Sequence, residues 1–403
     1  MNFDRLLSSA TTVPENPWNG FPEYNFVGGH IDRATVPVDD LLAAVSAGMQ
    51  KTGKELASYG LLSGPQGYLP LREYLVTKLQ RYSQVMCSAE EILLTSGSLQ
   101  GMDLVNKALL DAGDSVIVEE SNYGGALSRF NKLGVAMEAI PVDEDGMQID
   151  VLEKALATMA NEQRLPKFIY TIPTVHNPTG SILTLKRRKA MLALAARYDV
   201  AIVEDECYAD LVWDGQRPAA LYGLDTDARV IHIGTFSKTI SPALRVGYVV
   251  APWPMMGHIL ALKSDAGSGA LEQLLLAEYC PEHFDQHVAS NNQVLKRKLD
   301  TLTGALDREF GSTAEYWYPP GGIFLWVKFD KAVDTQKLAA VAGSEGVSIN
   351  PGHEWSLQGD SKSFIRLCFA YPEEKTIEAG IARLAEICHD TFGVPEYGAN
   401  RKR

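Results

Sequence analysis

Lys238 has the neighbours that a chemically active lysine needs. It follows a short apolar run, residues 230–234, and ends the tetrapeptide Thr235-Phe236-Ser237-Lys238, seven residues before Arg245. The run suits a buried strand that delivers the lysine to a loop at its carboxyl end. If burial and nearby cations lower the pKa of its amine, Lys238 can form an imine with an aldehyde, while Thr235, Ser237 and Arg245 bind a phosphate. Taken alone, a Ser-Lys pair is more often an exposed surface feature.

Asp205 is spaced to work with that lysine. It follows the apolar run 200–203 and lies 33 residues before Lys238. This is about the length of one strand-helix-strand unit, so two neighbouring parallel strands would present both residues at the same sheet edge. A buried Asp can keep a ring nitrogen protonated, which an electron-sink cofactor requires. The ordinary alternative is a solvated acid in a polar loop.

Three more predicted strands end in residues that suit a cofactor. Asn177, in a turn after residues 168–172, can bond a phenolic oxygen together with Tyr208. Residues 91–95 lead into Gly97-Ser98 and a helix start, where free amides bind phosphate. Residues 115–119 precede Tyr123, whose ring can stack on a planar group. Turn chemistry or packing explains each feature alone, but five such strand ends favour a cofactor site, because open α/β sheets bind ligands at this edge.

In this order, these residues resemble the fold-type I pyridoxal-phosphate enzymes, aminotransferase class I/II, and within them the branch that holds 2-aminoadipate and kynurenine aminotransferases. Further segments agree with that branch: Phe26-Val27-Gly28-Gly29, Tyr59 with residues 67–72, residues 320–326 and residues 364–369. The resemblance covers nearly the whole chain. It implies an α/β fold, with a large doubly wound, mostly parallel sheet domain and a smaller α+β domain built from the N- and C-terminal segments.

The resemblance implies a role for each matching residue. Lys238 would carry the cofactor, pyridoxal 5′-phosphate, and shuttle the proton between the substrate Cα and the cofactor C4′. Asp205 would bind the pyridine nitrogen, and Tyr123 would stack on the ring. The implied ligands of the phenolic oxygen are Asn177 and Tyr208, and those of the phosphate are Gly97, Ser98, Leu99, Thr235, Ser237 and Arg245.

On the substrate side, the resemblance implies that Arg366 grips the α-carboxylate with a bidentate fork. A surface ion pair is the ordinary alternative, but Arg366 lies in an apolar run, where an unpaired charge would be costly. The other implied substrate residues are Asn177, Gly29 and Tyr68. Tyr59 is implied to reach the phosphate of a neighbouring subunit, so we expect a homodimer with shared active sites.

The implied reaction moves an amino group from an aromatic, kynurenine-like or 2-aminoadipate-like amino acid to a 2-oxo acid such as 2-oxoglutarate. His176 and Leu99 stand where the branch usually has Gln, and Trp355 also departs from it. These differences leave open a second interpretation, a specialised pyridoxal-phosphate enzyme that catalyses elimination, replacement, oxidation or cyclisation of an amino acid. A non-catalytic cofactor-binding sensor is a third interpretation. Regulators of that kind carry a basic winged-helix region at the N-terminus, and the residues before the resemblance are expected to be too few for one.

Charge and cysteine content indicate which binding partners and which cellular compartment to expect. The chain has 37 basic and 50 acidic residues, a net charge of −13, which argues against nonspecific nucleic-acid binding. The five cysteines are scattered without metal-ligand spacing, so we expect no metal site and a reducing cytoplasm. No apolar stretch has membrane-spanning length, and we expect no membrane partner.

The 403 residues, 46% of them apolar, can bury a large core. We expect an N-terminal arm with part of the small domain in residues 1–45, a large cofactor-binding domain in residues 46–285 and a C-terminal small domain in residues 286–403. Residues 185–198 are predicted as an amphipathic crossover helix, and a long helix is predicted from about Pro281 to Phe310. Residues 48–54 fit most of a phosphate-loop pattern, but Glu55 stands where Ser or Thr should bind magnesium, so we interpret them as a helix end.

Overall fold

The computed structural model describes residues 5–7, 17–214, 217–357, 359 and 361–396. Its centre is a seven-stranded sheet in the order β2-β10-β9-β8-β7-β3-β4, which is parallel except for β10. The strands are β2 (Ile92–Ser96), β3 (Ser115–Glu119), β4 (Ala136–Ile140), β7 (Phe168–Thr171), β8 (Ala201–Asp205), β9 (Val230–Thr235) and β10 (Val246–Val250). The predicted strands before Ser98, Tyr123, Asn177, Asp205 and Lys238 all form. β8 and β9 are parallel neighbours, as the spacing of Asp205 and Lys238 predicted.

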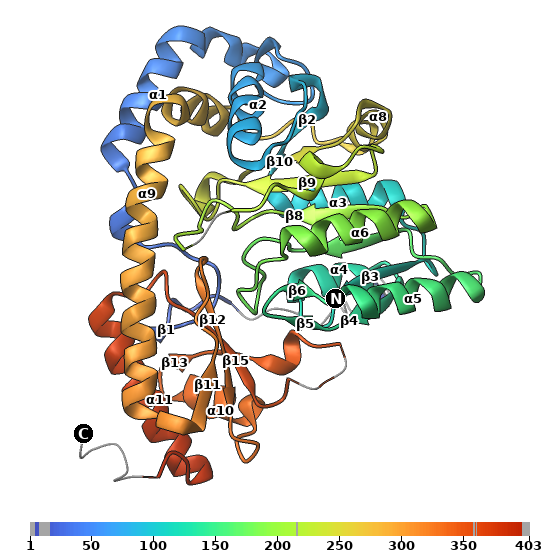
Figure 1. Ribbon diagram of the computed structural model, residues 1–403. Coiled ribbons are helices and arrows are strands. Elements are labelled where there is room, and N and C mark those ends of the chain that lie inside the picture. The colour runs from blue at the N-terminus through green and yellow to red at the C-terminus, as the bar shows by residue number, and fades with distance from the viewer. Residues whose placement is uncertain (1–4, 8–16, 215–216, 358, 360, 397–403) are drawn as a thin grey trace.

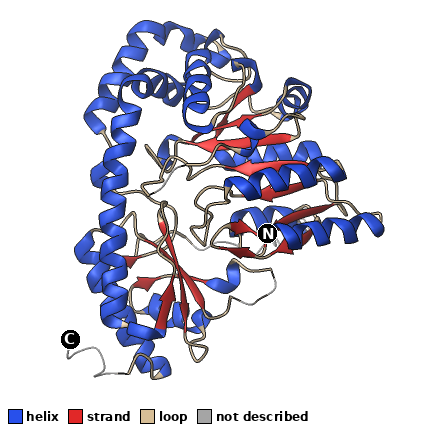
Figure 2. Cartoon of the chain, viewed as in Figure 1, coloured by secondary structure: helices blue, strands red, loops and turns tan. Residues whose placement is uncertain are grey.

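Helices cover both faces of this sheet because successive strand side chains point in opposite directions. Val116 and Val118 share a core with α3 (Ser98–Leu109), α4 (Gly124–Lys132) and α8 (Trp253–Leu262). Ile117 packs on the other face against α5 (Ile149–Asn161) and α6 (Leu185–Tyr198). The strands are therefore continuous apolar runs, and the bounds of α6 match the predicted crossover helix. Figures 1 and 2 show the layers. The predicted α/β fold class is confirmed.

A second sheet of four antiparallel strands has the order β11-β12-β15-β14. Its strands are β11 (Ala314–Tyr316), β12 (Phe324–Phe329), β14 (Asn350–Pro351) and β15 (Phe364–Cys368), and it is accompanied by α10 (Thr335–Ser344) and α11 (Glu374–Phe392). β1 (Tyr24–Asn25) pairs in parallel with β13 (Val347–Ser348). This pairing attaches an N-terminal segment to the C-terminal part of the chain. A small hairpin, β5 (Val142–Asp143) with β6 (Gly146–Met147), completes the strands of the described residues.

The long helix α9 (Ala270–Glu309) runs along both parts of the molecule (Figure 1). It packs against α1 (Val38–Thr52) and α2 (Leu69–Ser83) near its start, and against α11 further on. The prediction that this helix begins at Pro281 was wrong, because Pro281 lies inside it. Buried side chains on both sides of the proline, including Leu274 and Phe284, outweigh the lost backbone hydrogen bond. Residues 48–52 form the end of α1, as interpreted from the sequence.

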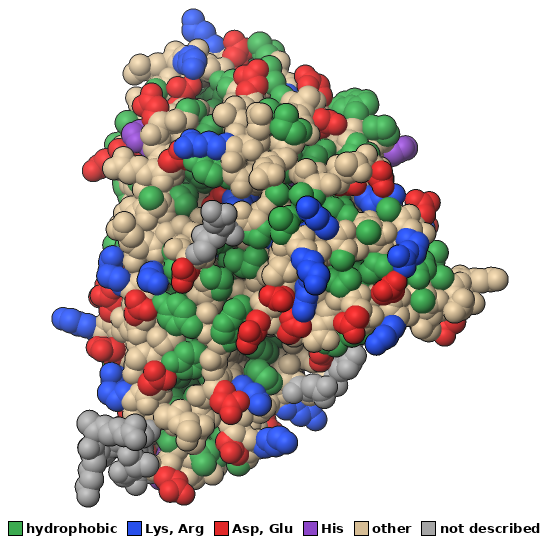
Figure 3. All heavy atoms as spheres, viewed as in Figure 1, with side chains coloured by type: hydrophobic (Ala, Val, Ile, Leu, Met, Phe, Trp, Pro, Cys, Tyr) green, Lys and Arg blue, Asp and Glu red, His purple; other side chains and the backbone are tan. Residues whose placement is uncertain are grey.

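The surface carries charges of both signs. On the face in Figure 3, lysine and arginine side chains alternate with aspartate and glutamate. None of the helices in the described residues combines the length and the apolar character that a membrane crossing requires.

Arg188 is a fully buried charge on α6 that ties together the loops after β7 and β8. Its guanidinium lies 3.3 Å from a carboxylate oxygen of Glu206 and donates to Thr174 Oγ1 at 2.7 Å and to the carbonyl of Pro173 at 2.8 Å. Burial raises the pKa of Glu206, and the charge of Arg188 opposes this shift. Since Thr174 precedes Asn177 and Glu206 follows Asp205, this ion pair supports two of the predicted site residues.

We expect Arg188→Met to lower the free energy of unfolding by about 3–5 kcal/mol, because Glu206 is left as a buried charge without its cation. Urea unfolding followed by circular dichroism measures the loss. The matched control is Arg187→Met, which removes a partly exposed ion pair with Asp143 and should cost about 1 kcal/mol or less. Equal losses in the two variants would contradict the structural role of Arg188.

Candidate active site

The five predicted strand ends meet at the carboxyl edge of the large sheet. Asn177, after β7, donates to the hydroxyl of Tyr208, after β8, at 3.3 Å. Ser98, after β2, hydrogen-bonds Cys207, which also interacts electrostatically with Lys238 after β9. Tyr123 follows β3 and begins α4. The structure thus gathers side chains from five strands into one site.

The amine of Lys238 lies beside the backbone of the N-terminal segment. Its Nζ donates to the carbonyl of Gly29 at 2.8 Å. Burial lowers the pKa of Lys238, and the charges of Arg366 and Arg245 lower it further. A Cβ on Gly29 would overlap with Nζ, so glycine is needed for this approach. These surroundings favour a neutral, nucleophilic amine.

Asp205 is a buried carboxylate without a cationic side-chain partner. It accepts hydrogen bonds from the hydroxyl of Tyr170 at 2.9 Å and from the amide of Cys207 at 3.2 Å. Burial raises the pKa of Asp205, and these hydrogen bonds oppose the shift. The part of the chain that the structure describes places no lysine or arginine within ion-pair distance of it. A cationic group from a ligand would therefore stabilise this carboxylate.

Arg366, on β15, brings a buried guanidinium to the same site. It stacks between two rings, with its central carbon 3.8 Å from the ring centre of Phe324 and 4.0 Å from that of Trp355. It donates to Asn177 Oδ1 at 3.1 Å and to Asn350 Oδ1 at 2.8 Å, but within the described ranges it has no carboxylate partner. Burial lowers the pKa of Arg366 to about 10. The arrangement suits an anionic ligand.

A second anion site is formed where α3 begins. Gly97 precedes the helix with a φ of 77°, and a Cβ there would overlap with the guanidinium of Arg245. Arg245 lies 3.4 Å from Ser237 Oγ, which accepts from Thr235 Oγ1 at 2.9 Å. The first helical residues, Ser98 and Leu99, have free amides that add positive potential. Together, these groups can hold a phosphate.

Two predicted site residues lie apart from this cluster. Tyr59 is 87% exposed, and the described chain alone does not show what it binds. Tyr68 is buried at the start of α2, where its hydroxyl lies 3.2 Å from Thr52 Oγ1 and its amide donates to Gln273. The roles implied for both in the sequence stay predictions.

Several residues that support the site had no role predicted from the sequence. Gly28 accepts from Arg366 through its carbonyl, while Tyr170 bonds Asp205. Phe324 and Asn350 hold Arg366 from two different strands. Asn350 precedes Pro351-Gly352 and has the sequence signal of an ordinary turn. Only its position on the strand beside β15 shows what it contacts.

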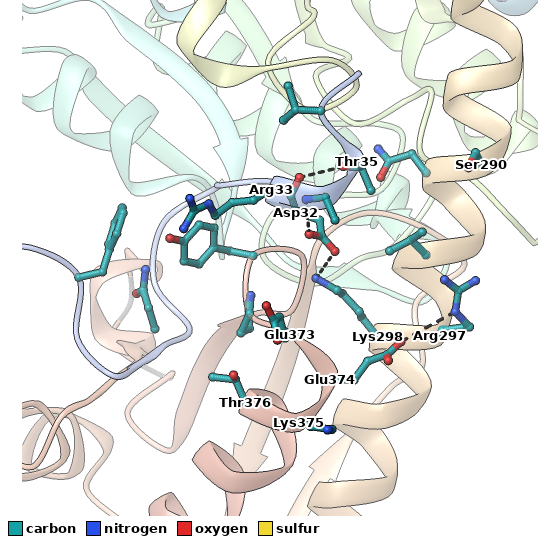
Figure 4. A pocket seen from close by; sticks show the side chains of 18 of the residues that line it. Asp32, Arg33, Thr35, Ser290, Arg297, Lys298, Glu373, Glu374, Lys375 and Thr376 are labelled. Atoms are coloured by element: carbon teal, nitrogen blue, oxygen red, sulfur yellow. Dashed lines mark hydrogen bonds and ion pairs between the residues drawn. The ribbon is translucent and has the colours of Figure 1, made fainter. Parts of the chain in front are cut away.

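The N-terminal strap, which we define as residues 24–32, brings Gly28 and Gly29 to the site. Its far end is fixed by an ion pair of 2.6 Å between Asp32 and Lys298 on α9. Lys298 also donates to the carbonyl of Ala370, which follows β15, at 2.8 Å. The pair borders a cavity of about 1260 Å³ between α9, the strap and the start of α11 (Figure 4). Lys298 thus connects the two segments that carry Gly29 and Arg366.

The lowered pKa of Lys238 has a consequence for the stability of the cofactor-free protein. Below the folded-state pKa, the buried ammonium reduces stability. As pH rises from that pKa toward the ordinary value of 10.5, the folded state loses the proton that the unfolded state still holds, so the penalty disappears. We therefore expect Lys238→Met to be more stable than the wild type at pH 7, with an advantage that shrinks as pH rises. Thermal unfolding between pH 7 and 10 measures it.

The exposed Lys132→Met is the control for this comparison and should show no such trend. An advantage of Lys238→Met that stays constant with pH would show that Lys238 is not desolvated in the folded protein.

Comparison with known proteins agrees with this geometry. The chain matches the family model described as aminotransferase class I and II over residues 35–384. Aromatic-amino-acid aminotransferase 1 of Thermococcus litoralis is 31% identical over 365 residues, 90% of this chain and 87% of that protein. An uncharacterized HTH-type transcriptional regulator of Bacillus subtilis is 32% identical over 347 residues, 85% of this chain and 70% of the regulator.

A solved structure is similar over the same extent. The crystal structure of LysN, the α-aminoadipate aminotransferase of Thermus thermophilus in complex with N-(5′-phosphopyridoxyl)-L-leucine, has a TM-score of 0.84 and 30% identity and covers 91% of this chain and 92% of its own. The resemblance drawn from the sequence is confirmed. The chain belongs to aminotransferase class I and II, enzymes that use pyridoxal phosphate to move an amino group from an amino acid to a 2-oxo acid.

Proposed function

We propose that this aminotransferase holds pyridoxal phosphate between Asp205, Lys238 and Arg245, and binds the substrate α-carboxylate at Arg366. The observation that carries the proposal is the charge pattern of the site. Asp205 is a buried anion, and Arg366 and Arg245 are cations, none of which has an ion-pair partner among the described residues. A protonated pyridine nitrogen, a carboxylate and a phosphate are the charges that would complement them.

The shape of the site supports the same cofactor. Gly97 and Gly29 lack the side chains that would crowd Arg245 and Lys238, respectively. We assign Gly97, Ser98, Leu99, Thr235, Ser237 and Arg245 to the phosphate, Asn177 and Tyr208 to the phenolic oxygen, and Tyr123 to the face of the ring. These assignments place the phosphate group at a helix start, where free amides favour anions.

When bound, pyridoxal phosphate supplies an electron sink for the charge that develops at the substrate Cα. The protein supplies position and proton transfer. Arg366 orients the substrate through its carboxylate, and Asp205 keeps the ring nitrogen protonated. Because burial and two arginines lower its pKa, Lys238 is able to accept the Cα proton near neutral pH. The rings of Phe324 and Trp355 exclude water from both faces of the Arg366 guanidinium.

For the substrate, we propose an aromatic, kynurenine-like or 2-aminoadipate-like amino acid, with a 2-oxo acid such as 2-oxoglutarate as acceptor. The aromatic-amino-acid and α-aminoadipate relatives support the first and last classes. Tyr123 lies 6.2 Å from Trp355 between ring centres, so an aromatic wall stands next to Arg366. Trp355 is therefore a residue that a flat substrate side chain would contact.

We also propose a homodimer in which Tyr59 reaches the phosphate site of the second copy. Tyr59 is 87% exposed, and this part of the chain carries further exposed apolar side chains, Leu42 and Met49 on α1 and Leu56 and Leu62 in the segment that follows it. A second copy that covers this surface would bury apolar area.

The half-reaction tests the function. We expect the purified enzyme with pyridoxal phosphate to convert a matching amino acid into an equal amount of 2-oxo acid without any acceptor, with loss of the cofactor's absorbance band. A panel of aromatic, kynurenine-like and dicarboxylic amino acids identifies the donor. Arg366→Lys should lower kcat/KM for the best donor at least about 30-fold, because lysine lacks the bidentate fork and its loss removes about 2 kcal/mol.

The outcomes separate the alternatives. Ammonia release or oxygen consumption in place of stoichiometric 2-oxo acid would indicate the specialised enzyme. A cofactor spectrum that no amino acid changes would favour the non-catalytic cofactor-binding sensor. Lys238→Ala is the inactive reference for both assays.

A further inference from the structure

Two buried titratable residues, Glu119 and His176, stand behind the proposed ring-binding residues and take no part in the function described above. Glu119 ends β3 and is 2% exposed, while His176 follows β7 and is 3% exposed. β3 and β7 are neighbours in the sheet. The two side chains face each other, with 3.9 Å between His176 Nε2 and Glu119 Oε2.

Glu119 joins two segments through its two carboxylate oxygens. Oε1 accepts from the hydroxyl of Thr171 and from the amide of Ile172 at 3.2 Å, both at the end of β7. Oε2 accepts from Asn122 Nδ2 at 2.6 Å, in the loop after β3. Burial raises the pKa of Glu119 to about 7, and these donors oppose the shift. Burying the Glu119 carboxylate costs free energy. We therefore expect the contacts that it makes with these two segments to have a role.

The hydrogen bonds around His176 are compatible with a tautomer that carries the ring hydrogen on Nε2. Thr179 Oγ1 accepts from the amide of Ser181 at 3.3 Å and lies 3.0 Å from the hydroxyl of Ser181. With Ser181 as the donor, the hydrogen of Thr179 is directed to His176 Nδ1, at 2.8 Å. Burial lowers the pKa of His176 to about 3, so the ring is neutral. In this tautomer the single ring hydrogen is on Nε2, which faces Glu119 Oε2 at 3.9 Å and has no hydrogen-bond partner among the described residues.

Glu119 and His176 both lie close to residues that we propose to contact the cofactor. Asn122, held by Glu119, accepts the amide hydrogen of Tyr123 at 2.6 Å and so fixes the start of α4. His176 directly precedes Asn177, and its backbone accepts from Gly180 across the turn. Asn177 in turn bonds Tyr208 and Arg366. The Glu119 carboxylate therefore joins the Tyr123 loop to the end of β7, from which the chain continues into the Asn177 turn.

We propose that Glu119 and His176 form a positioning pair that holds Tyr123 and Asn177 at a fixed separation around the cofactor ring. The inference rests on the proposed function, since it assumes that Asn177 contacts the phenolic oxygen and Tyr123 the ring face. Neither member of the pair touches the reacting atoms. Glu119 acts on Tyr123 through Asn122, and His176 acts on Asn177, the next residue in the chain.

The test is the pH midpoint of the absorbance change of bound pyridoxal phosphate, which depends on the hydrogen bond from Asn177 to the phenolic oxygen. In Glu119→Gln, the amide group that replaces one carboxylate oxygen faces a donor in either orientation, Asn122 Nδ2 at the Oε2 position or the amide of Ile172 at the Oε1 position. We expect the midpoint to rise by about half to one pH unit, the equivalent of one weakened hydrogen bond. His176→Leu should act in the same direction, whereas His176→Gln keeps a donor toward Glu119 and should stay near the wild type.

A second readout is the dissociation constant of pyridoxal phosphate, measured by titration of the cofactor-free protein. It should change less than about threefold in Glu119→Gln, because Ser98, Ser237 and Arg245 bind the phosphate from other strands. A loss of affinity as large as the loss in Arg245→Ala would mean general damage to the site and would overturn the positioning role.

Glu204→Gln is the matched control. Glu204 is also a fully buried glutamate paired with a histidine, with 2.8 Å between its Oε1 and His232 Nδ1, but it bonds the amides of Leu221 and Tyr222 instead of a site residue. It should lower thermal stability and leave the midpoint unchanged. If Asn177→Ala shifts the midpoint but Glu119→Gln gives the same midpoint as Glu204→Gln, the positioning role of Glu119 and His176 is wrong. The role of Asn177 would still hold. An unchanged midpoint in Asn177→Ala contradicts the role of Asn177 and removes what the pair would position.

Discussion

Buried charges that the chain leaves without ion-pair partners are the constraint on which the site depends. Asp205 and Arg366 are nearly enclosed, and Lys238 is close to both arginines of the site, yet none of them has an oppositely charged partner in the described residues. Such groups are costly to bury, and hydrogen bonds hold them in place: Tyr170 donates to Asp205, and Asn177 and Asn350 accept from Arg366. A ligand with complementary charges recovers this cost on binding, which makes binding energy available for the reaction.

The positions of these charges follow from the parallel sheet. Because β2, β3, β7, β8 and β9 point the same way, the residues after each strand meet at one edge. Arg366 and Gly29 come from outside that sheet. β1 pairs with β13, and Lys298 contacts both Asp32 and Ala370. These contacts fix Arg366 relative to Gly29, whose carbonyl accepts from Lys238. Behind the edge, Glu119 and Arg188 tie neighbouring strand ends to each other.

The sequence predicted most of this edge and little of what lies beyond it. Asp205, Asn177 and Lys238 follow their apolar runs within two to five residues, so local pattern was enough to place them near strand ends. The stacking of Arg366 between Phe324 and Trp355 joins three separate segments, and no local pattern indicates it. The start of α9 was missed because buried contacts on both sides of Pro281 outweigh its helix-breaking tendency. Tyr59 is exposed in the single chain, so the role proposed for it depends on a second copy.

The central claim is that the buried amine of Lys238 is the group that carries pyridoxal phosphate. Other lysines provide a stringent comparison, because Lys78 and Lys298 are buried but are neutralised by Asp210 and Asp32. The most direct measurement is reduction of the cofactor-loaded enzyme with borohydride, followed by proteolysis and mass spectrometry of the labelled peptide. We expect a single pyridoxyl group on Lys238. A label on Lys78, on Lys298 or on any other lysine, or no label at all, would contradict it.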